Sequence, residues 1–291
     1  MRHLTAIVPV ADYLSRQRSL HEIIEGTIAY QDKLTLFIVF SGSKAHTDES
    51  NFKSSFGEAP DYIRTFLLPC SSPGLARDYG LSFVTTSWVT FWDDDDKPFP
   101  KVILESIAAS IDSEMIVGQY VVRDFAREQI LVRKETVSLN QLSVDTGLWR
   151  IIFLTTLAKR VSFPNSFLGE DRLYVRSILL QRPKVSFASR IHYQYSFGNN
   201  SLTSTISSSD ILLDFQQHVK LSISNPEDNF GNLMTATLFI SYLVKSAKPI
   251  EIVNSITKLL RLRPFLLLLL TCKALYLKGS LRLRLFRGAL P

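Results

Sequence analysis

The sequence predicts an α/β protein in which helices flank a mostly parallel sheet and a helical region follows. Over the first 200 residues, short apolar runs rich in β-branched and aromatic residues alternate with amphipathic stretches of helical spacing. From about residue 210 onward the pattern is helical. The chain has 291 residues, of which 46% are hydrophobic and 21% charged, and this composition is ordinary for a globular protein of one or two domains.

The first sixty residues predict a strand, a helix and a second strand. Residues 4–10 and 34–40 form nearly continuous apolar runs, as expected of strands buried on both faces. Apolar side chains at helical spacing between them predict a helix over residues 16–30. A unit of this kind is right-handed. Residues 44–60 are polar, and we expect a loop there.

The following segment predicts a third strand and then a helix start. Residues 62–68 are strand-like, and a Pro-Gly pair at 73 and 74 suits the first turn of a helix, whose free N–H groups can bind an anion. Arg77 lies near that start. It is expected either to bind a phosphate or to form an ion pair with Asp78 or with the acids at 93–96.

An apolar run at residues 88–92 ends abruptly in four aspartates, Asp93, Asp94, Asp95 and Asp96. Adjacent like charges repel one another unless a cation lies among them. Ligands collect at the carboxyl ends of strands in open α/β sheets, and hard divalent cations prefer oxygen ligands. The run therefore predicts a metal–diphosphate site, and a solvated acidic turn is the alternative.

The second half of the body predicts more strands and helices. Residues 115–122 and 129–132 are expected to form a hairpin or sheet extension, and residues 146–158 a helix. Two short strands are expected at 184–188 and 191–197. Helices are then expected at 210–222 and 226–246, with a third from Pro249.

An acidic pair, Glu170 and Asp171, opens another predicted helix that continues to about Leu180. Carboxylates stabilise helix N-termini through the helix dipole, so capping explains the pair. A carboxylate in that place can also serve as a general base. The residues alone leave both explanations open.

The net charge of +6 belongs to the C-terminal tail. Residues 252–291 carry eight basic and no acidic side chains, whereas residues 1–251 carry 25 basic and 27 acidic ones. This distribution argues against a body that binds nucleic acid. The longest uncharged run in the tail, residues 264–272, is far too short to span a bilayer. The tail is expected to pack on the body, to lie at a membrane interface, or to contact a dimer partner or another protein.

The expected compartment is cytoplasmic. The chain enters a strand-like run directly after its first three residues, so we expect no secretory signal. Cys70 and Cys272 are expected to be free thiols in a reducing environment. If the tail binds lipid, the protein lies peripherally on the inner face of the plasma membrane.

Taken in order, these segments resemble glycosyltransferase family 2, the inverting nucleotide-sugar transferases of GT-A fold. The resemblance covers residues 4–205 and rests on five features: the strand ending in Pro9, the turn Pro73-Gly74-x-Ala76-Arg77-x-x-Gly80, the run Asp93–Asp96, Gly169-Glu170-Asp171, and the aromatic strand with Tyr193 and Tyr195. It implies a GT-A catalytic domain at residues 1–205 and a helical region at residues 206–291.

The resemblance also implies roles for the matched residues. Asp95 and Asp93 would hold a divalent metal, Mn²⁺ or Mg²⁺, that bridges the donor diphosphate. Asp171 would be the general base, with Glu170 beside it as the other catalytic carboxylate. The donor-binding residues would be Pro9, Val10, Ala11, Asp12, Ser41, Arg77, Asp93 and Asp94.

The chain departs from the family pattern at three places. Phe40 and Ser41 stand where an acidic pair usually helps to recognise the base, and Ala11-Asp12 stands in place of Tyr-Asn. Asp78 replaces a common Asn. These segments therefore do not fix the nucleotide, and a UDP-sugar is the expected donor.

The leading hypothesis is a metal-dependent inverting glycosyltransferase of the hexosyltransferase type. It would move a sugar from a nucleotide-sugar donor to a hydroxyl of a saccharide or lipid-linked acceptor in cell-surface polysaccharide synthesis. One alternative is a nucleotidyltransferase, which would release pyrophosphate. Another is a membrane-associated binding or scaffold protein without catalysis, whose acids are structural. No nucleic-acid partner is expected.

Overall fold

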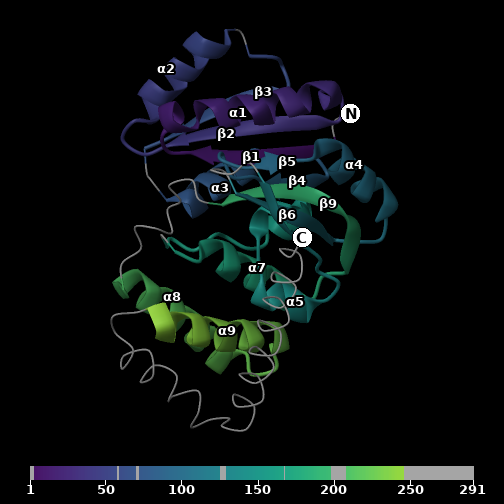
Figure 1. Ribbon diagram of the computed structural model, residues 1–291, viewed down its shortest axis with the longest axis vertical. Coiled ribbons are helices and arrows are strands. Elements are labelled where there is room, and N and C mark those ends of the chain that lie inside the picture. Colours follow the sequence, from purple (N-terminus) through teal and green to yellow (C-terminus); the bar gives the residue numbers. More distant parts are fainter. Residues whose placement is uncertain are drawn as a thin grey trace. The chain divides into compact units, whose positions relative to one another are not determined.

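The computed structural model confirms the α/β fold and describes residues 3–57, 59–69, 72–124, 129–166, 168–197 and 208–245. Within these ranges a nine-stranded mixed sheet runs in the order β3-β2-β1-β4-β8-β6-β9-β5, with β7 paired to β6 (Figure 1). The strands are β1 (Leu4–Val10), β2 (Leu34–Ser41), β3 (Ile63–Leu68), β4 (Trp88–Phe91), β5 (Lys97–Pro98), β6 (Met115–Asp124), β7 (Gln129–Lys134), β8 (Ile151–Leu154) and β9 (Val185–Phe197).

Helices connect these strands and follow them. They are α1 (Tyr13–Thr27), α2 (Ala45–Phe56), α3 (Pro73–Ser82), α4 (Pro100–Ala109), α5 (Leu139–Val144), α6 (Thr155–Ala158), α7 (Glu170–Leu180), α8 (Ser208–Ser224) and α9 (Asn229–Lys245), with 3-10 turns η1 (Ile28–Tyr30) and η2 (Leu148–Arg150).

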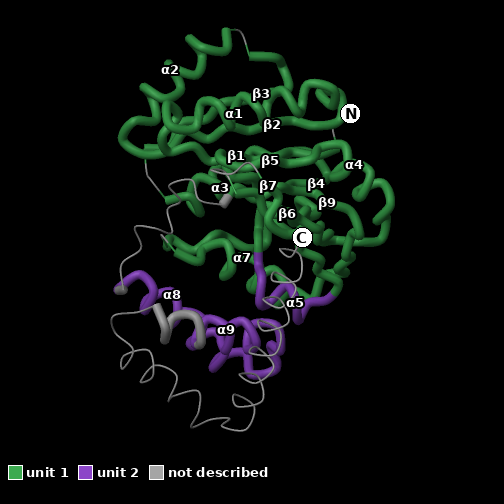
Figure 2. The backbone as a smooth tube through the Cα atoms, in the orientation of Figure 1, with its two compact units in different colours: residues 1–137, 147–199 green, residues 138–146, 200–291 purple. Residues whose placement is uncertain are grey.

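The chain forms two compact units (Figure 2). One comprises residues 1–137 and 147–199 and contains the whole sheet. The other comprises residues 138–146 and 200–291. The sequence-based domain boundary at residue 205 stays a prediction.

The parallel half of the sheet determines where the acidic turn after β4 and the loops after β1 and β2 lie. β1 pairs with β2 on one side and with β4 on the other, and β2 pairs with β3, all in parallel. Val10 lies opposite Phe40, and Ile7 lies opposite Phe91. Because parallel strands end at the same edge, the residues that follow β1, β2 and β4 share one edge of the sheet.

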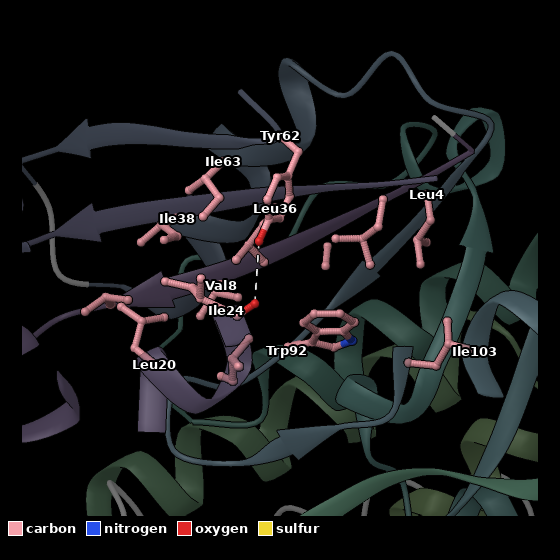
Figure 3. Packing of buried hydrophobic residues seen from close by; sticks show 14 of the residues in the cluster. Leu4, Val8, Leu20, Ile24, Leu36, Ile38, Tyr62, Ile63, Trp92 and Ile103 are labelled. Carbon is pink, nitrogen blue, oxygen red and sulfur yellow. Dashed lines mark hydrogen bonds between the residues drawn. The ribbon is translucent and has the colours of Figure 1, made fainter. Parts of the chain in front are cut away.

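Helices cover both faces of β1. One face carries Leu4 and Val8 into a buried cluster with Leu20 and Ile24 of α1 (Figure 3). There the Tyr62 hydroxyl donates to the Ile24 carbonyl at 3.5 Å. Burial of these apolar side chains on both faces is what fixes the register of the strands.

On the opposite face, α3 packs closely through Gly80. A Cβ placed at Gly80 would lie 2.8 Å from Cγ2 of Ile7 and 3.1 Å from Cγ2 of Val39. Only glycine therefore lets this helix lie so near the sheet. The close approach brings the preceding turn of α3, with Arg77, to the edge where β4 ends.

Three expected elements differ in the structure. Residues 45–56 form the helix α2 rather than a loop, because Ala45, Asp48 and Phe52 make a narrow buried stripe on an otherwise polar helix. The helix expected over 146–158 is wrong: β8 occupies its centre, paired between β4 and β6. A short apolar run suits either element, and here the strand pairing decides. The two strands expected at 184–197 form the single strand β9.

The described part of the second unit, taken by itself, is helical as expected. α8 and α9 pack through apolar contacts, including Phe215 against Phe239 with ring centroids 6.1 Å apart. A buried hydrogen bond joins Ser222 and Thr235 at 2.9 Å. No helix within the described ranges has the length and hydropathy needed to cross a membrane. The third predicted helix, the basic tail, Cys70 and Cys272 lie outside these ranges.

Gly118 in β6 makes room for the buried imidazole of His192 in β9. A Cβ at Gly118 would lie 2.0 Å from Nδ1 of His192. The register of β6 against β9 shifts around this glycine. Nε2 of His192 is hydrogen-bonded to the Ser106 hydroxyl of α4 at 2.8 Å. The glycine thus allows one side chain to tie β9 to the helix beneath it.

We predict that Gly118→Ala lowers the free energy of unfolding by about 2 to 3 kcal/mol, because the new methyl group overpacks the site. Gly26→Ala is the control: it lies in α1, nothing lies within 4 Å of its Cβ position, and it is expected to be neutral or stabilising by up to about 1 kcal/mol. Urea unfolding of both variants measures this. Equal effects would contradict the steric argument.

Burial also predicts a pH dependence. It lowers the pKa of His192 from its ordinary 6.5 to about 4, with a smaller effect in the same direction from the charge of Arg150. Between about pH 6.5 and pH 4, His192 therefore binds a proton in the unfolded chain but stays neutral in the folded chain. Stability is fully present above pH 6.5 and declines as the pH falls toward 4, by on the order of 3 kcal/mol from this group.

Urea unfolding between pH 7 and pH 5 checks this expectation. His192→Gln should show a shallower loss of stability than the wild type over that range, whatever its stability at pH 7. His3→Gln, at an exposed position, should follow the wild-type slope. Parallel slopes in all three proteins would rule out His192 as the titrating group.

Candidate active site

The acidic turn Asp93–Asp96 is anchored by the buried residue that precedes it. Trp92 is fully buried in the cluster that includes Ile103 of α4, and its backbone N–H donates to the Ile7 carbonyl of β1 at 2.9 Å. Figure 3 shows its indole among the core side chains. The tryptophan thereby fixes the point where the chain leaves the sheet and the carboxylates begin.

The four aspartates are held by three different groups. Asp93 accepts from Nη2 of Arg77 at 2.7 Å. Asp94 and Asp95 face Arg16 of α1, with Nε 3.7 Å from Oδ1 of Asp94 and Nη1 3.2 Å from Oδ2 of Asp95. Asp96 is buried and accepts from a backbone N–H of β9 at 2.7 Å. The like charges are thus held by separate groups from three elements.

Arg77 connects the turn to the start of α7. Its Nη1 donates to Oε1 of Glu170 at 2.8 Å while its Nη2 holds Asp93, and the side chain is almost completely buried. Burial by itself lowers the pKa of Arg77, but the charges of Asp93, Glu170 and Asp171 outweigh it and raise the pKa above its ordinary value. Of the ion-pair partners expected for Arg77, the structure brings the acidic turn to it.

Asp78, the other expected partner, points elsewhere. Its carboxylate accepts from the Phe163 backbone N–H at 2.9 Å and so fixes the segment that leads into α7. Nearby, a Cβ at Gly74 would lie 3.1 Å from Cγ of Glu170 and 3.1 Å from the Pro164 carbonyl. α3 and the start of α7 are therefore in close contact.

Five carboxyl groups of the site, those of Asp93–Asp96 and Glu170, have raised pKa values. Burial, reinforced by the charge of Asp95, raises the pKa of Asp94 to about 8. Burial also raises the pKa of Asp93, Asp95 and, most strongly, Asp96. The pKa of Glu170 rises to about 7, again through burial, against the opposing charge of Arg77. Raised carboxyl pKa values are typical of functional sites, and a bound cation would lower them again.

An aromatic group supports the turn from β9. The backbone N–H of Asp93 donates to the Tyr193 hydroxyl at 3.0 Å. Trp149 stacks on Tyr193, with centroids 4.5 Å apart and an interplanar angle of 20°, and on Tyr195 at 5.7 Å and 13°. Both tyrosines lie on the strand β9, as the sequence predicts, and Tyr193 contacts the acidic turn directly.

The expected donor-binding residues lie at the same sheet edge. Pro9 and Val10 end β1, and the buried Ser41 ends β2. Ala11 and Asp12 follow as exposed residues before α1. The charge of Asp12 acts on Asp48 of α2, whose pKa burial raises and Asp12 raises further. Their roles toward a donor stay predictions.

Glu170 and Asp171 occupy the first turn of α7. The N-cap is Gly169, which has a φ of 73°, a left-handed conformation that favours glycine. Neither acid is therefore the capping residue, although both benefit from the helix dipole. Glu170 is buried against Arg77, whereas Asp171 is half-buried.

Sequence reasoning missed Arg16 and Trp149. The predicted helix begins at residue 16, which gives that side chain no role. Residue 149 falls in the helix expected over 146–158, whereas in the structure it lies in the short 3-10 turn η2. One available signal was the first basic residue of the helix, which comes soon after the first loop. Its approach to the acids nevertheless depends on the packing of α1, which no local pattern reveals.

The donor set fits a hard divalent cation by its chemistry. Six carboxyl groups, those of Asp93–Asp96, Glu170 and Asp171, lie near only two guanidinium groups, so acidic side chains outnumber basic ones in this cluster. Oxygen ligands of this kind suit Mg²⁺ or Mn²⁺. As the side chains stand, no three His, Cys, Asp or Glu residues in the described ranges converge on one metal position.

Comparison with solved structures places the fold among glycosyltransferases. No protein-family model matches the chain, and no curated protein sequence matches it. Structural matches are numerous, and the α/β architecture is of the GT-A type seen in those enzymes.

Two matches illustrate this similarity. The S. aureus TarS 1-349 structure in complex with UDP-GlcNAc superimposes with a TM-score of 0.67 at 16% identity, covering 96% of this chain and 91% of that one. The mannosyltransferase PcManGT from Pyrobaculum calidifontis, in complex with GDP-Man and Mn²⁺, gives a TM-score of 0.57 at 14% identity, covering 99% and 88%. At such identities the likeness concerns the fold.

We predict that Arg77→Met lowers the free energy of unfolding by about 3 to 5 kcal/mol, because it leaves Asp93 and Glu170 buried without their shared partner. The control is Arg18→Met, which removes an exposed ion pair with Glu22 and should cost less than about 0.5 kcal/mol. Chemical unfolding compares the two variants. A small loss for Arg77→Met would show that the bridge is not a structural link.

Proposed function

We propose that the chain is a glycosyltransferase that moves a sugar from a nucleoside-diphosphate donor to an acceptor hydroxyl. The observation that carries the proposal is the buried acidic turn at the carboxyl end of β4, joined through Arg77 to the carboxylates that open α7. The fold shared with glycosyltransferases, including structures that contain UDP-GlcNAc or GDP-Man with Mn²⁺, supports it.

The donor side of the reaction lies at the edge formed by β1, β2 and β4. A divalent cation, Mn²⁺ or Mg²⁺, would be held by Asp95 and Asp93, and when bound it supplies positive charge to the leaving diphosphate. The donor itself would rest on the residues expected from the sequence, which are Pro9, Val10, Ala11, Asp12, Ser41, Arg77 and Asp94. A UDP-sugar is the proposed donor.

The acceptor side begins at α7. Asp171 is the proposed general base, which takes the proton of the acceptor hydroxyl as that oxygen attacks the anomeric carbon. Glu170 is less suited to this step, because Arg77 holds one of its oxygens in a buried ion pair. Glu170 is therefore proposed to act beside the base as the other carboxylate of the pair, held by Arg77. A single displacement on the face opposite the leaving diphosphate inverts the anomeric centre.

The proposed acceptor is a saccharide or a lipid-linked saccharide used in cell-surface polysaccharide synthesis. The basic, leucine-rich tail would bring the protein to the inner face of the plasma membrane, where such an acceptor resides. The proposed location is accordingly cytoplasmic with peripheral membrane contact. These statements rest on the sequence of residues 252–291.

A thermal-shift panel of nucleoside diphosphates with and without Mn²⁺ tests the donor site. Mass action predicts about 2.7 kcal/mol of stabilisation at a ligand concentration one hundred times the dissociation constant. We expect a Mn²⁺-dependent shift with UDP in the wild type and its loss in Asp95→Asn. Asp171→Asn should keep the shift but lose sugar transfer by about 10² to 10⁴-fold, since general-base catalysis contributes that much.

Asp32→Asn is the matched control, because this exposed aspartate precedes β2 at the opposite edge of the sheet. It should keep both the shift and the transfer activity. Unimpaired transfer by Asp171→Asn would remove that residue from the base role. Pyrophosphate among the products would favour the nucleotidyltransferase, and no shift with any diphosphate would favour a non-catalytic binding protein.

A further inference from the structure

Arg16 lies where a positive charge neutralises the centre of the acidic turn. It contacts both Asp94 and Asp95, and the three side chains have only 16%, 18% and 19% of their surface exposed. One turn further along α1, the Ser19 hydroxyl donates to the backbone carbonyl of Asp94 at 2.7 Å. The helix and the turn are therefore joined by a backbone contact that does not depend on the arginine.

The two arginines of the cluster are held differently. Arg77 has 7% of its side chain exposed and binds Asp93 and Glu170 at 2.7 and 2.8 Å, so its departure would strand two buried carboxylates. Arg16 makes longer contacts, 3.2 and 3.7 Å, from a more exposed position. Because the Ser19 hydroxyl also joins α1 to the turn, a rotation of the Arg16 side chain would leave this hydrogen bond in place.

Resting on the function proposed above, we propose that Arg16 is an exchangeable counter-ion. It neutralises Asp94 and Asp95 in the metal-free protein, yields Asp95 to the divalent cation, and then binds the diphosphate of the donor. A divalent cation brings twice the charge of a guanidinium to the same oxygens, so the exchange is favourable. The fork of N–H donors on the freed side chain suits phosphate oxygens.

The exchange makes metal and nucleotide binding respond to Arg16 in opposite directions. Without the arginine, the cation has no competitor for Asp95 and binds more tightly. The diphosphate, however, loses a ligand and binds more weakly. If Arg16 only stabilised the fold, its replacement in a folded variant would not strengthen metal binding and weaken diphosphate binding at the same time.

Mn²⁺ titration without nucleotide, followed by electron paramagnetic resonance, tests the first half. Arg16→Gln should bind Mn²⁺ about tenfold more tightly than the wild type, since a partly buried competing charge is removed. Arg18→Gln is the matched control: it removes the same charge from the same helix, but that side chain is 84% exposed and pairs with Glu22. It should stay within about twofold of the wild type.

UDP binding at saturating Mn²⁺, measured by calorimetry, tests the second half. Arg16→Gln should bind UDP about tenfold more weakly, in line with the loss of one charge-assisted contact. Arg18→Gln should bind it as the wild type does. Unchanged Mn²⁺ and UDP affinities in Arg16→Gln, with normal binding by the wild type, would overturn the inference and leave the proposed function standing.

A measurement on the unaltered protein guards against a variant that fails to fold. Titration with diamagnetic Mg²⁺ should shift the Nε–H resonance of Arg16 and leave that of Arg18 in place. A resonance of Arg16 that stays fixed while Mg²⁺ binds would overturn the exchange. If neither the wild type nor Arg16→Gln binds Mn²⁺ or Mg²⁺, both the inference and the metal dependence of the proposed function fall together.

Discussion

The buried bridge from Asp93 through Arg77 to Glu170 is the interaction on which the rest of the site depends. It joins residues 93 and 170, which lie far apart in the sequence, with one side chain and two short hydrogen bonds. The cost of burying three charged groups is offset only while all three stay together. The bridge therefore holds the acidic turn after β4 and the first turn of α7 in one fixed relation. Gly74 and Gly80 permit it, since they let α3 approach both α7 and the sheet.

Much of the fold could be predicted because its strands carry a strong pattern. β1, β2 and β4 are buried on both faces and read as continuous apolar runs, which is typical of the centre of a parallel sheet. The incorrect predictions fall where the hydrophobic pattern of the sequence is weak. α2 buries only a narrow stripe, and β8 is four residues whose strand character comes from pairing with β4 and β6. Propensity cannot supply either fact, because both depend on neighbours distant in sequence.

For the site, the sequence predicted which acids would lie at the strand end but not how they would be held. Four adjacent aspartates after a buried strand identify an unusual concentration of charge without any knowledge of the fold. The division of these acids between Arg77, Arg16 and the backbone of β9 is a property of three packed elements. Trp149 illustrates the same limit: it lies just before β8, and its stacking on Tyr193 depends on the pairing of β8 with β6 and of β6 with β9, not on its own surroundings in the chain.

The pairing of β4 with β8 has a consequence for how such a chain can diversify. The segment between these strands begins after residue 91, adds β5, β6 and β7 to the same sheet, and ends at residue 151 in β8, which pairs directly with β4. Its two ends are therefore fixed beside each other, whatever the segment contains. Loops in the middle of this segment can change in length or composition while β4 and β8 stay paired. Connections of this segment that lie away from the four aspartates can thus acquire new partners over time, while the paired strands that hold the aspartates remain as they are.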